Sequence, residues 1–511
     1  MRNLYYYNWQ LQESVFGVVM DDIKERYEQD EIYFVSCKGS LLPCWSNKLA
    51  DPLKCKICKF NQKSAFSSDF KKVKQLYIDD YASNEEVARE FETLGLGIYQ
   101  TNEDIRNLEY KGMSIGYGAL SSYISSTRNR DPLIDETFKS YFNGLLKTQI
   151  FIKIAIDRII QEINPEIITI FNGRIHDTRP VFQTAIEKGL TLRGVETVVR
   201  GEFDYHRRIF ENALPHDIAF QTKQIEETWN TTTHSLEEKI EIGSKFYENR
   251  RKSILTRDVK VYTKNQKAGL LPEHWDESKT NIVIFNSSED EFAAIGKEWD
   301  DLALFNDQME GICYILEQVK DENVHFYLRV HPNLTKVTYG YHTRLYNLEK
   351  EYNNITVIAA SSPISTYTLI DYAEKIVVFG SSTGVEGTYS EKPVVLLGGS
   401  FYYYLDATYI PKSREEVIFL ITSKLEPKPQ LGSLKFGYYL MNMDSYSKPI
   451  AFNAKPLILF GKKLCYTFPH LKVFGSNLLH KFVLLLIRIK YNIESKLKKQ
   501  NLMAFPKAEH K

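Results

Sequence analysis

The stretch KIVVFGSSTGVEGTYSEKPVVLLG (375–398) indicates the fold class of the C-terminal half of the chain. Two apolar runs of strand length, KIVVFGS (375–381) and PVVLLG (393–398), flank a hydroxyl-rich turn and a segment of helical length. Strand, helix and strand in this order are typical of a parallel sheet, and strands rich in Val and Leu are buried on both faces of such a sheet.

The same alternation extends toward the N-terminus. Further strands are predicted at NIVIFNS (281–287), NVHFYLRV (323–330) and NITVIA (354–359), and in the N-terminal half at EIYFVSC (31–37), EIITIF (166–171) and GVETVV (194–199). A long amphipathic helix is expected from about Asp135 to Ile163, where Asn164 and Pro165 end it. The chain has 511 residues, which is more than the roughly 250–300 that a single core supports.

We therefore predict an α/β chain of the GT-B-like kind, with two Rossmann-type, doubly wound parallel-sheet domains that face a cleft, followed by a helical C-terminal tail. The N-terminal domain is expected over residues 1–265, the C-terminal domain over 275–425 and the tail over 426–511. The stretch from about Glu238 to Leu271 is polar and lacks strand character, so it marks the end of the first domain and the linker.

Composition narrows the function classes. Acidic and basic residues balance at 65 each, so the chain lacks the positive field that nucleic-acid binding requires. The N-terminus shows no signal-peptide pattern, and no run reaches the roughly 18 apolar residues that span a bilayer. We expect a cytoplasmic protein that binds no nucleic acid.

The sequence RVHP (329–332) ends a predicted strand. Residues two apart on a strand project to the same side, so Arg329 and His331 are expected to point together. Ligands of parallel sheets bind beyond the carboxyl ends of the strands. A guanidinium and an imidazole at that place suit a phosphate group, although a structural Arg with a capping His is the alternative.

The turn after the strand at 375–381 is the second candidate. Ser381, Ser382 and Thr383 are expected in the first turn of a helix, where N–H groups and hydroxyls attract anions. Glu386 lies one turn further on, placed to hold ribose hydroxyls. The alternative is an ordinary helix cap.

Together these motifs resemble the capsule polysaccharide biosynthesis glycosyltransferases. They also resemble the wider GT-B groups with an HP motif and a serine motif, namely sialyl-, polysialyl- and Kdo-transferases and CDP-glycerol glycerophosphotransferases. The resemblance implies that His331, Ser381, Ser382 and Thr383 bind the phosphate of a nucleotide-linked donor, often CMP- or CDP-linked. The stretch FNSSEDEF (285–292) also looks like this group, and the likeness implies that Ser287, Ser288 and Glu291 lie at the cleft.

The N-terminal domain is expected to bind the acceptor and to supply a general base. Asn172 and Arg174 follow the strand at 166–171, on the acceptor side. An inverting transferase needs a carboxylate or an imidazole to deprotonate the attacking hydroxyl. The candidates are Asp177, His176 and Glu202, in that order, and the acidic base motif of the polysialyltransferases has no clear counterpart here. The glycine-rich stretch 112–130 is expected to flex over the acceptor.

Four cysteines fall in a short loop region, 37–58. Cys37, Cys44, Cys55 and Cys58 have six, ten and two residues between them. Four thiolates are the ligand set of a structural zinc site. Free thiols beside a surface loop are the alternative.

The segment SNLLHKFVLLLIRIKYNIESKLKKQ (476–500) combines an apolar centre with flanking lysines and an arginine. Such a helix either lies on an anionic membrane, which makes the protein peripheral on the inner face of the plasma membrane, or packs back on the first domain.

The sequence as a whole predicts a glycosyltransferase of surface, capsule or O-antigen-type, polysaccharide biosynthesis, which transfers a sugar from a nucleotide-linked donor to a growing or lipid-linked glycan. Catalysis is expected to need no metal at the donor phosphate. The alternatives are a transferase of CDP-linked glycerol or polyol phosphate, and a non-catalytic assembly factor of the polysaccharide machinery.

Overall fold

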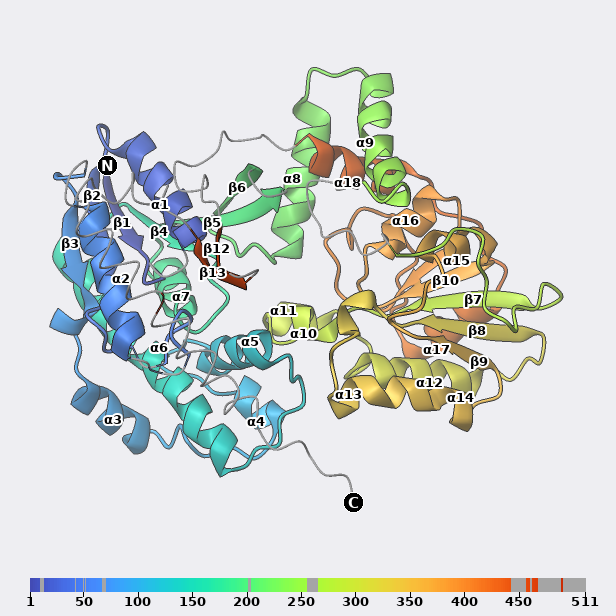
Figure 1. Ribbon diagram of the computed structural model, residues 1–511, viewed down its shortest axis with the longest axis horizontal. Coiled ribbons are helices and arrows are strands. Elements are labelled where there is room, and N and C mark those ends of the chain that lie inside the picture. Colours follow the sequence, from blue (N-terminus) through green and yellow to red (C-terminus); the bar gives the residue numbers. More distant parts are fainter. Residues whose placement is uncertain are drawn as a thin grey trace. The chain divides into compact units, whose positions relative to one another are not determined.

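The computed structural model describes residues 1–9, 13–41, 43–48, 50, 52–66, 70–200, 204–254, 265–442, 456–459, 462–466 and 489. The chain forms two compact units (Figure 1). The first contains Met1–Ser122 and Ile134–Leu214, and the second contains Tyr123–Leu133 and Pro215–Asp444. Each is a Rossmann-type α/β unit, so the predicted pair of Rossmann-type domains is confirmed.

The sheet of the first unit has the strand order β3-β2-β1-β4-β5-β6. The strands are β1 (Arg2–Tyr6), β2 (Glu31–Ser36), β3 (Lys74–Tyr77), β4 (Ile167–Phe171), β5 (Thr191–Arg200) and β6 (Asp204–Glu211). Strands β1 to β5 are parallel, and β6 pairs antiparallel with β5. The chain adds strands outward from β1 to β3 and then returns to β4. The switch point of this sheet therefore lies between β1 and β4.

The helices of the first unit connect and cover these strands. They are α1 (Glu13–Arg26), α2 (Pro52–Ala65), α3 (Asn84–Thr93), α4 (Asn102–Arg106), the first part of α5 (Ile115–Thr127), α6 (Glu136–Ile163) and α7 (Arg179–Glu187), with the short 3-10 helix η1 (Ile78–Asp80) after β3. The long predicted helix is confirmed as α6. The Asp135 side chain accepts the N–H of Phe138 at its start, and Asn164 ends it in the left-handed region at φ 48°.

The glycine-rich stretch 112–130 differs from the expected flexible loop, because it forms helix α5. Two of its glycines, Gly116 and Gly118, permit close packing. A Cβ on Gly116 would lie 1.6 Å from the Ile105 carbonyl oxygen, and one on Gly118 would lie 2.2 Å from Gln149 Oε1.

The sheet of the second unit is entirely parallel, in the order β11-β10-β7-β8-β9. All five predicted strands form, as β7 (Thr280–Phe285), β8 (Val324–Arg329), β9 (Ile355–Ile358), β10 (Lys375–Val378) and β11 (Val394–Leu396). Successive residues of β7 pack on opposite faces. Ile282 and Ile284 join one apolar cluster, and Val283 and Phe285 join the other. The switch point of this sheet lies between β7 and β10.

The division between the units differs from the predicted boundary near residue 265. The second unit already begins at Pro215, and it includes α8 (Ile218–Thr231), α9 (Leu236–Arg251) and α18 (Leu431–Met441). Helices α9 and α18 cross closely because two glycines meet there. A Cβ on Gly243 would lie 2.7 Å from the Leu434 carbonyl oxygen, and one on Gly437 would lie 2.5 Å from the Gly243 carbonyl oxygen. This contact joins α9 and α18 within the second unit. Helix α18 therefore belongs to that unit, although the sequence predicted it as part of the tail over 426–511.

The remaining helices of the second unit are short. They are α10 (Glu289–Phe292), α11 (Lys297–Asp301), α12 (Gln308–Gln318), α13 (Gly340–Thr343), α14 (Leu348–Glu351), α15 (Thr366–Tyr372), α16 (Thr383–Tyr389) and α17 (Arg414–Thr422), with 3-10 turns η2 (Pro332–Leu334) and η3 (Arg344–Asn347). Two further strands, β12 (Pro456–Leu459) and β13 (Lys462–Tyr466), pair antiparallel and belong to the first unit.

The tail segment 476–500 lies outside the described residues apart from Ile489, so both readings of it stay predictions. Among the helices that the structure does describe, none has the length and apolar character needed to cross a bilayer.

Candidate functional site

The carboxyl ends of three strands are tied together in the second unit. After β7, the Asn286 side chain accepts the backbone N–H of His331, 2.8 Å away, which follows β8. The next residue, Ser287, donates its hydroxyl to the Phe379 carbonyl, 2.9 Å away, which follows β10. The Ser287 bond joins the two strands at the switch point, β7 and β10, where sheets of this kind bind ligands. We call this region the strand-end site.

The imidazole of His331 has a defined protonation state at this site. Its Nδ1 accepts the backbone N–H of Asn333 at 3.2 Å, so the ring hydrogen of the neutral form lies on Nε2. Burial, assisted by the cations Arg329 and Arg128, lowers the pKa of His331 from 6.5 to about 4. The ring is therefore neutral at pH 7, with its hydrogen on Nε2. The predicted role of His331 in binding phosphate stays a prediction.

Arg329 is placed differently from His331. It is 2% exposed, and both terminal nitrogens donate to backbone carbonyls, one to Ala359 and one to Ser362, the latter at 3.1 Å. Burial lowers the pKa of Arg329 to about 10. The guanidinium holds the loop after β9 in place. Its connection to the strand-end site is electrostatic, because its positive charge helps to lower the pKa of His331.

A second arginine, which the sequence-based reasoning had assigned to the loop 112–130, belongs to this site. Arg128 lies in the segment Tyr123–Leu133 of the second unit. Its Nε and Nη2 donate to the Asp290 carboxylate at 2.6 and 3.0 Å, and Nη2 also donates to Ser288 Oγ at 2.9 Å. Its Nη1 donates to the Asn333 carbonyl at 3.0 Å. Arg128 thus brings a second cation close to His331, which the sequence around His331 did not predict.

The serines and the glutamate predicted from FNSSEDEF (285–292) lie at the strand-end site. Ser287 accepts the Gln308 amide at 2.6 Å. Ser288 donates to Asp290 at 2.7 Å, and Glu291 accepts the Asn333 amide at 2.6 Å. In this conformation they organise the turn after β7 through bonds to their own unit.

The hydroxyl-rich turn after β10 depends on a glycine. Gly380 has φ +94°, and a Cβ there would lie 2.6 Å from the Gly399 carbonyl oxygen. Beyond it, Ser381 Oγ accepts the N–H of Thr383 at 3.3 Å and its hydroxyl at 2.9 Å. The structure therefore places Ser381 and Thr383 at the carboxyl end of β10, as the sequence predicted.

Glu386 is enclosed behind this turn with 3% exposure. Its carboxylate accepts from Arg250 at 2.9 Å, from Tyr367 at 2.6 Å and from Ser382 at 3.1 Å. Arg250 also donates to Ser382 at 2.9 Å. Sequence reasoning missed Arg250 and Tyr367, because they come from α9 and α15. The predicted contact of Glu386 with ribose stays a prediction, and in the structure Glu386 binds side chains of its own unit.

In the first unit, Asp177 and His176 lie behind the end of β4, enclosed by protein. Asp177 is 0% and His176 is 1% exposed. Asp177 accepts from Asn8 Nδ2 at 3.1 Å, Trp9 Nε1 at 3.0 Å and the Trp45 backbone N–H at 2.9 Å.

The imidazole of His176 completes this buried cluster. Its Nε2 lies 2.5 Å from Asp177 Oδ1, and its Nδ1 lies 2.7 Å from Ser122 Oγ. In this conformation the pair fastens the loop that carries Trp45. Their role as a base stays a prediction that requires this region to open, and Glu202 lies outside the described residues.

The predicted acceptor-side residues occupy the turn after β4. Asn172 has φ +64° and donates its amide to Glu196 at 2.7 Å. Its side-chain oxygen accepts the Arg174 backbone N–H at 3.0 Å. The turn follows β4, one of the two strands at the switch point of the first sheet, and its contact with an acceptor stays a prediction.

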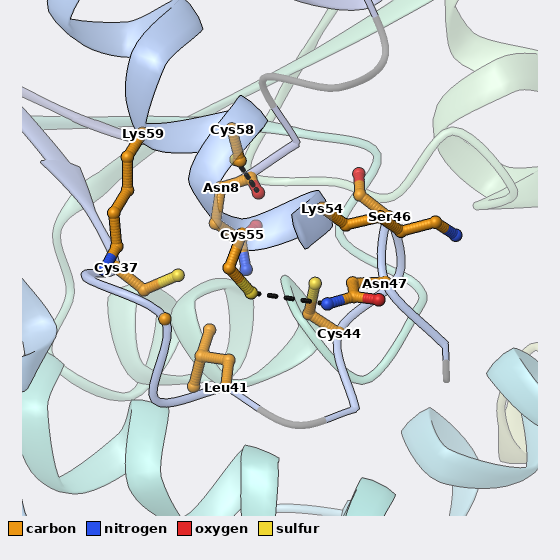
Figure 2. A pocket seen from close by; sticks show the side chains of 11 residues that line it. Asn8, Cys37, Leu41, Cys44, Ser46, Asn47, Lys54, Cys55, Cys58 and Lys59 are labelled. Carbon is orange, nitrogen blue, oxygen red and sulfur yellow. Dashed lines mark hydrogen bonds between the residues drawn. The ribbon is translucent and has the colours of Figure 1, made fainter. Parts of the chain in front are cut away.

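The four clustered cysteines line one pocket of the first unit (Figure 2). Cys37 follows β2, Cys44 lies in the loop that precedes α2, and Cys55 and Cys58 lie one turn apart on α2. Burial raises the pKa of Cys37 and Cys44. Within the described part of the chain, no three His, Cys, Asp or Glu side chains form a ready-made metal centre.

Comparison with known proteins gives distant structural likenesses. No protein-family model matches the sequence, and no curated protein matches it. Similar solved structures include the β-Kdo 2,4 transferase of Thermosulfurimonas dismutans KpsC, at 17% identity and a TM-score of 0.35 over 53% of this chain and 78% of that one.

Two further structures are similar at lower identity. The β-Kdo 2,7 transferase of the same KpsC gives 13% identity and a TM-score of 0.32 over 58% of this chain and 87% of that one. A UDP-GlcNAc 2-epimerase from Neisseria meningitidis gives 9% and 0.23 over 85% and 98%. Likenesses at this level carry no argument about activity.

Proposed function

We propose that this chain is a glycosyltransferase of surface polysaccharide biosynthesis that takes its sugar from a nucleotide-linked donor. One observation carries the proposal: His331 lies at the carboxyl ends of β7 and β8, where its backbone N–H donates to Asn286 and its Nδ1 accepts the N–H of Asn333. The resemblance of RVHP (329–332) and of the turn after β10 to the HP and serine motifs supports it.

The proposed chemistry is displacement of the nucleotide by an acceptor hydroxyl. The sugar–phosphate bond breaks, and the leaving phosphate gains negative charge. A preorganised N–H from His331 and hydroxyls from Ser381 and Thr383 then offset this charge without a metal ion at the donor phosphate. The donor binds the second unit, and a base of the first unit accepts the proton of the attacking hydroxyl. Asp177, His176 and Glu202 remain the proposed bases.

A binding screen with purified full-length protein tests the donor. CMP, CDP, UDP and GDP are titrated separately in a calorimeter, and each nucleotide that binds is followed by hydrolysis assays with its sugar conjugates. We expect one nucleotide to bind wild-type protein and the His325→Ala variant, but not the His331→Ala variant. His325 lies on β8, six residues before His331, and contacts Thr356, so it is a matched control.

The outcomes separate the functions. Hydrolysis of a nucleotide sugar without acceptor supports a transferase. Turnover of CDP-glycerol instead identifies a polyol-phosphate transferase. If no nucleotide binds, the proposed donor site is wrong and an assembly factor is the better description.

A further inference from the structure

The four clustered cysteines come from three separate elements, yet their side chains line the same pocket. Cys37 and Cys58 are 21 positions apart in the sequence. In Figure 2 the side chains of Cys37, Cys44 and Cys55 point into this pocket, and Cys58 borders it from the next turn of α2. The spacing of the four cysteines in the sequence does not by itself require their side chains to line one pocket.

N–H groups surround the sulfurs. The Asn47 amide donates to Cys55 Sγ at 3.3 Å. Gly39 and Asn47 line the same pocket as the sulfurs, and the Asn47 backbone N–H donates to the Cys44 carbonyl oxygen at 3.0 Å. Gly39 lies at φ +111°, a conformation that favours glycine. Outer N–H donors of this kind orient metal ligands and stabilise their negative charge.

Charge and size also fit one metal ion. Four thiolates with one divalent cation carry a net charge of −2, and Lys54 and Lys59 line the same pocket. The cavity is about 10 Å³, which is roughly the space of a single water molecule. It therefore has room for one ion.

We propose that Cys37, Cys44, Cys55 and Cys58 bind one structural zinc ion in this pocket. Zinc prefers four thiolates in a tetrahedron, with Zn–S distances of about 2.3 Å. Because these side chains do not form a coordination sphere as placed, binding requires the four sulfurs to move closer together, and each thiol releases one proton. Cys58 then leaves its contact with the Asn8 carbonyl, 3.9 Å away.

The ion would stabilise the switch-point edge of the first unit. Asn8 borders the pocket and donates to Asp177, and Asp177 accepts the N–H of Trp45 in the cysteine-bearing loop. Zinc would join β2, this loop and α2 next to that cluster. Its role is structural and does not depend on the proposed transferase activity.

Elemental analysis of the full-length protein tests the site. Protein is produced with added zinc and purified under reducing conditions without chelator. We expect about one zinc per chain in the wild type and most of it lost in Cys44→Ser and Cys55→Ser. Cys313→Ser is the matched control and should keep its zinc, because Cys313 packs beside Met309 in the second unit.

A second measurement avoids variants that fail to fold. Wild-type protein loaded with Co²⁺ in place of Zn²⁺ should show a thiolate-to-cobalt charge-transfer band. Absence of both zinc and this band would overturn the proposal. So would iron in place of zinc, full zinc content in the folded Cys55→Ser variant, or disulfides among these cysteines in protein alkylated at lysis.

Discussion

Replacement of His331 tests the strand-end site most directly. Alanine removes one preorganised N–H donor, and loss of such a donor to a developing anion typically costs about 3 kcal/mol, or roughly a hundredfold in turnover. The ring is neutral and uses Nδ1 to accept from Asn333. The N–H on Nε2 is therefore the group whose loss should matter.

The geometry also predicts which substitution restores activity. A glutamine amide nitrogen extends to about the position of Nε2, whereas an asparagine amide is shorter and resembles Nδ1. His331→Gln should therefore recover part of the lost turnover, and His331→Asn should not. Single-turnover rates with saturating donor separate this effect from weaker donor binding. His325→Ala controls for the loss of a histidine on β8.

Two results would refute this reasoning. Wild-type turnover in His331→Ala would show that the ring does not contact the leaving group. Equal recovery in the Gln and Asn variants would show that Nε2 is not the donating atom.

Three further predictions concern pH, Asp177 and the tail. Burial lowers the folded-state pKa of His331 to about 4, so the contribution of its neutral form to stability is complete above pH 6.5 and falls as the pH drops toward 4. Urea unfolding should show that the free energy of unfolding decreases by about 2 kcal/mol at pH 5. The His331→Gln variant should lack this decrease. Asp177→Asn should lower the melting temperature, because buried N–H groups left without a carboxylate reduce the free energy of unfolding by about 3 kcal/mol. Lost turnover at an unchanged melting temperature would instead make Asp177 the base. Truncation after about Ser476 should abolish salt-sensitive sedimentation with anionic vesicles, since each basic residue near such a surface contributes about 1 kcal/mol to membrane binding. If the full chain does not sediment and the truncated chain has a lower melting temperature, the segment packs on the protein instead.

Several elements were readable from the sequence because their signals are local. The five strands of the second unit are continuous apolar runs, and this is what burial on both faces of a parallel sheet demands. Helix α6 has an apolar face, Asp135 at its start and Asn164 at its end. The positions of His331 and Ser381 beyond their strands followed from the strands themselves.

Other elements depended on contacts between distant residues. Strand β1 has the sequence RNLYY, which no apolar alternation marks. It is central because it pairs with both β2 and β4, and its buried Asn3 accepts the hydroxyl of Thr169 on β4. The extent of the second unit depends on Gly243 and Gly437, which let α9 and α18 meet.

The same distinction applies to the site residues. Arg128 lies 162 positions from Asp290 in the sequence. Asp177 accepts hydrogen bonds from Asn8 and Trp45, which lie 169 and 132 positions away. A sequence pattern shows which side chains carry suitable chemistry. Burial and the choice of partner are set by long-range packing, because the free energy of a charge depends on what surrounds it in the folded chain.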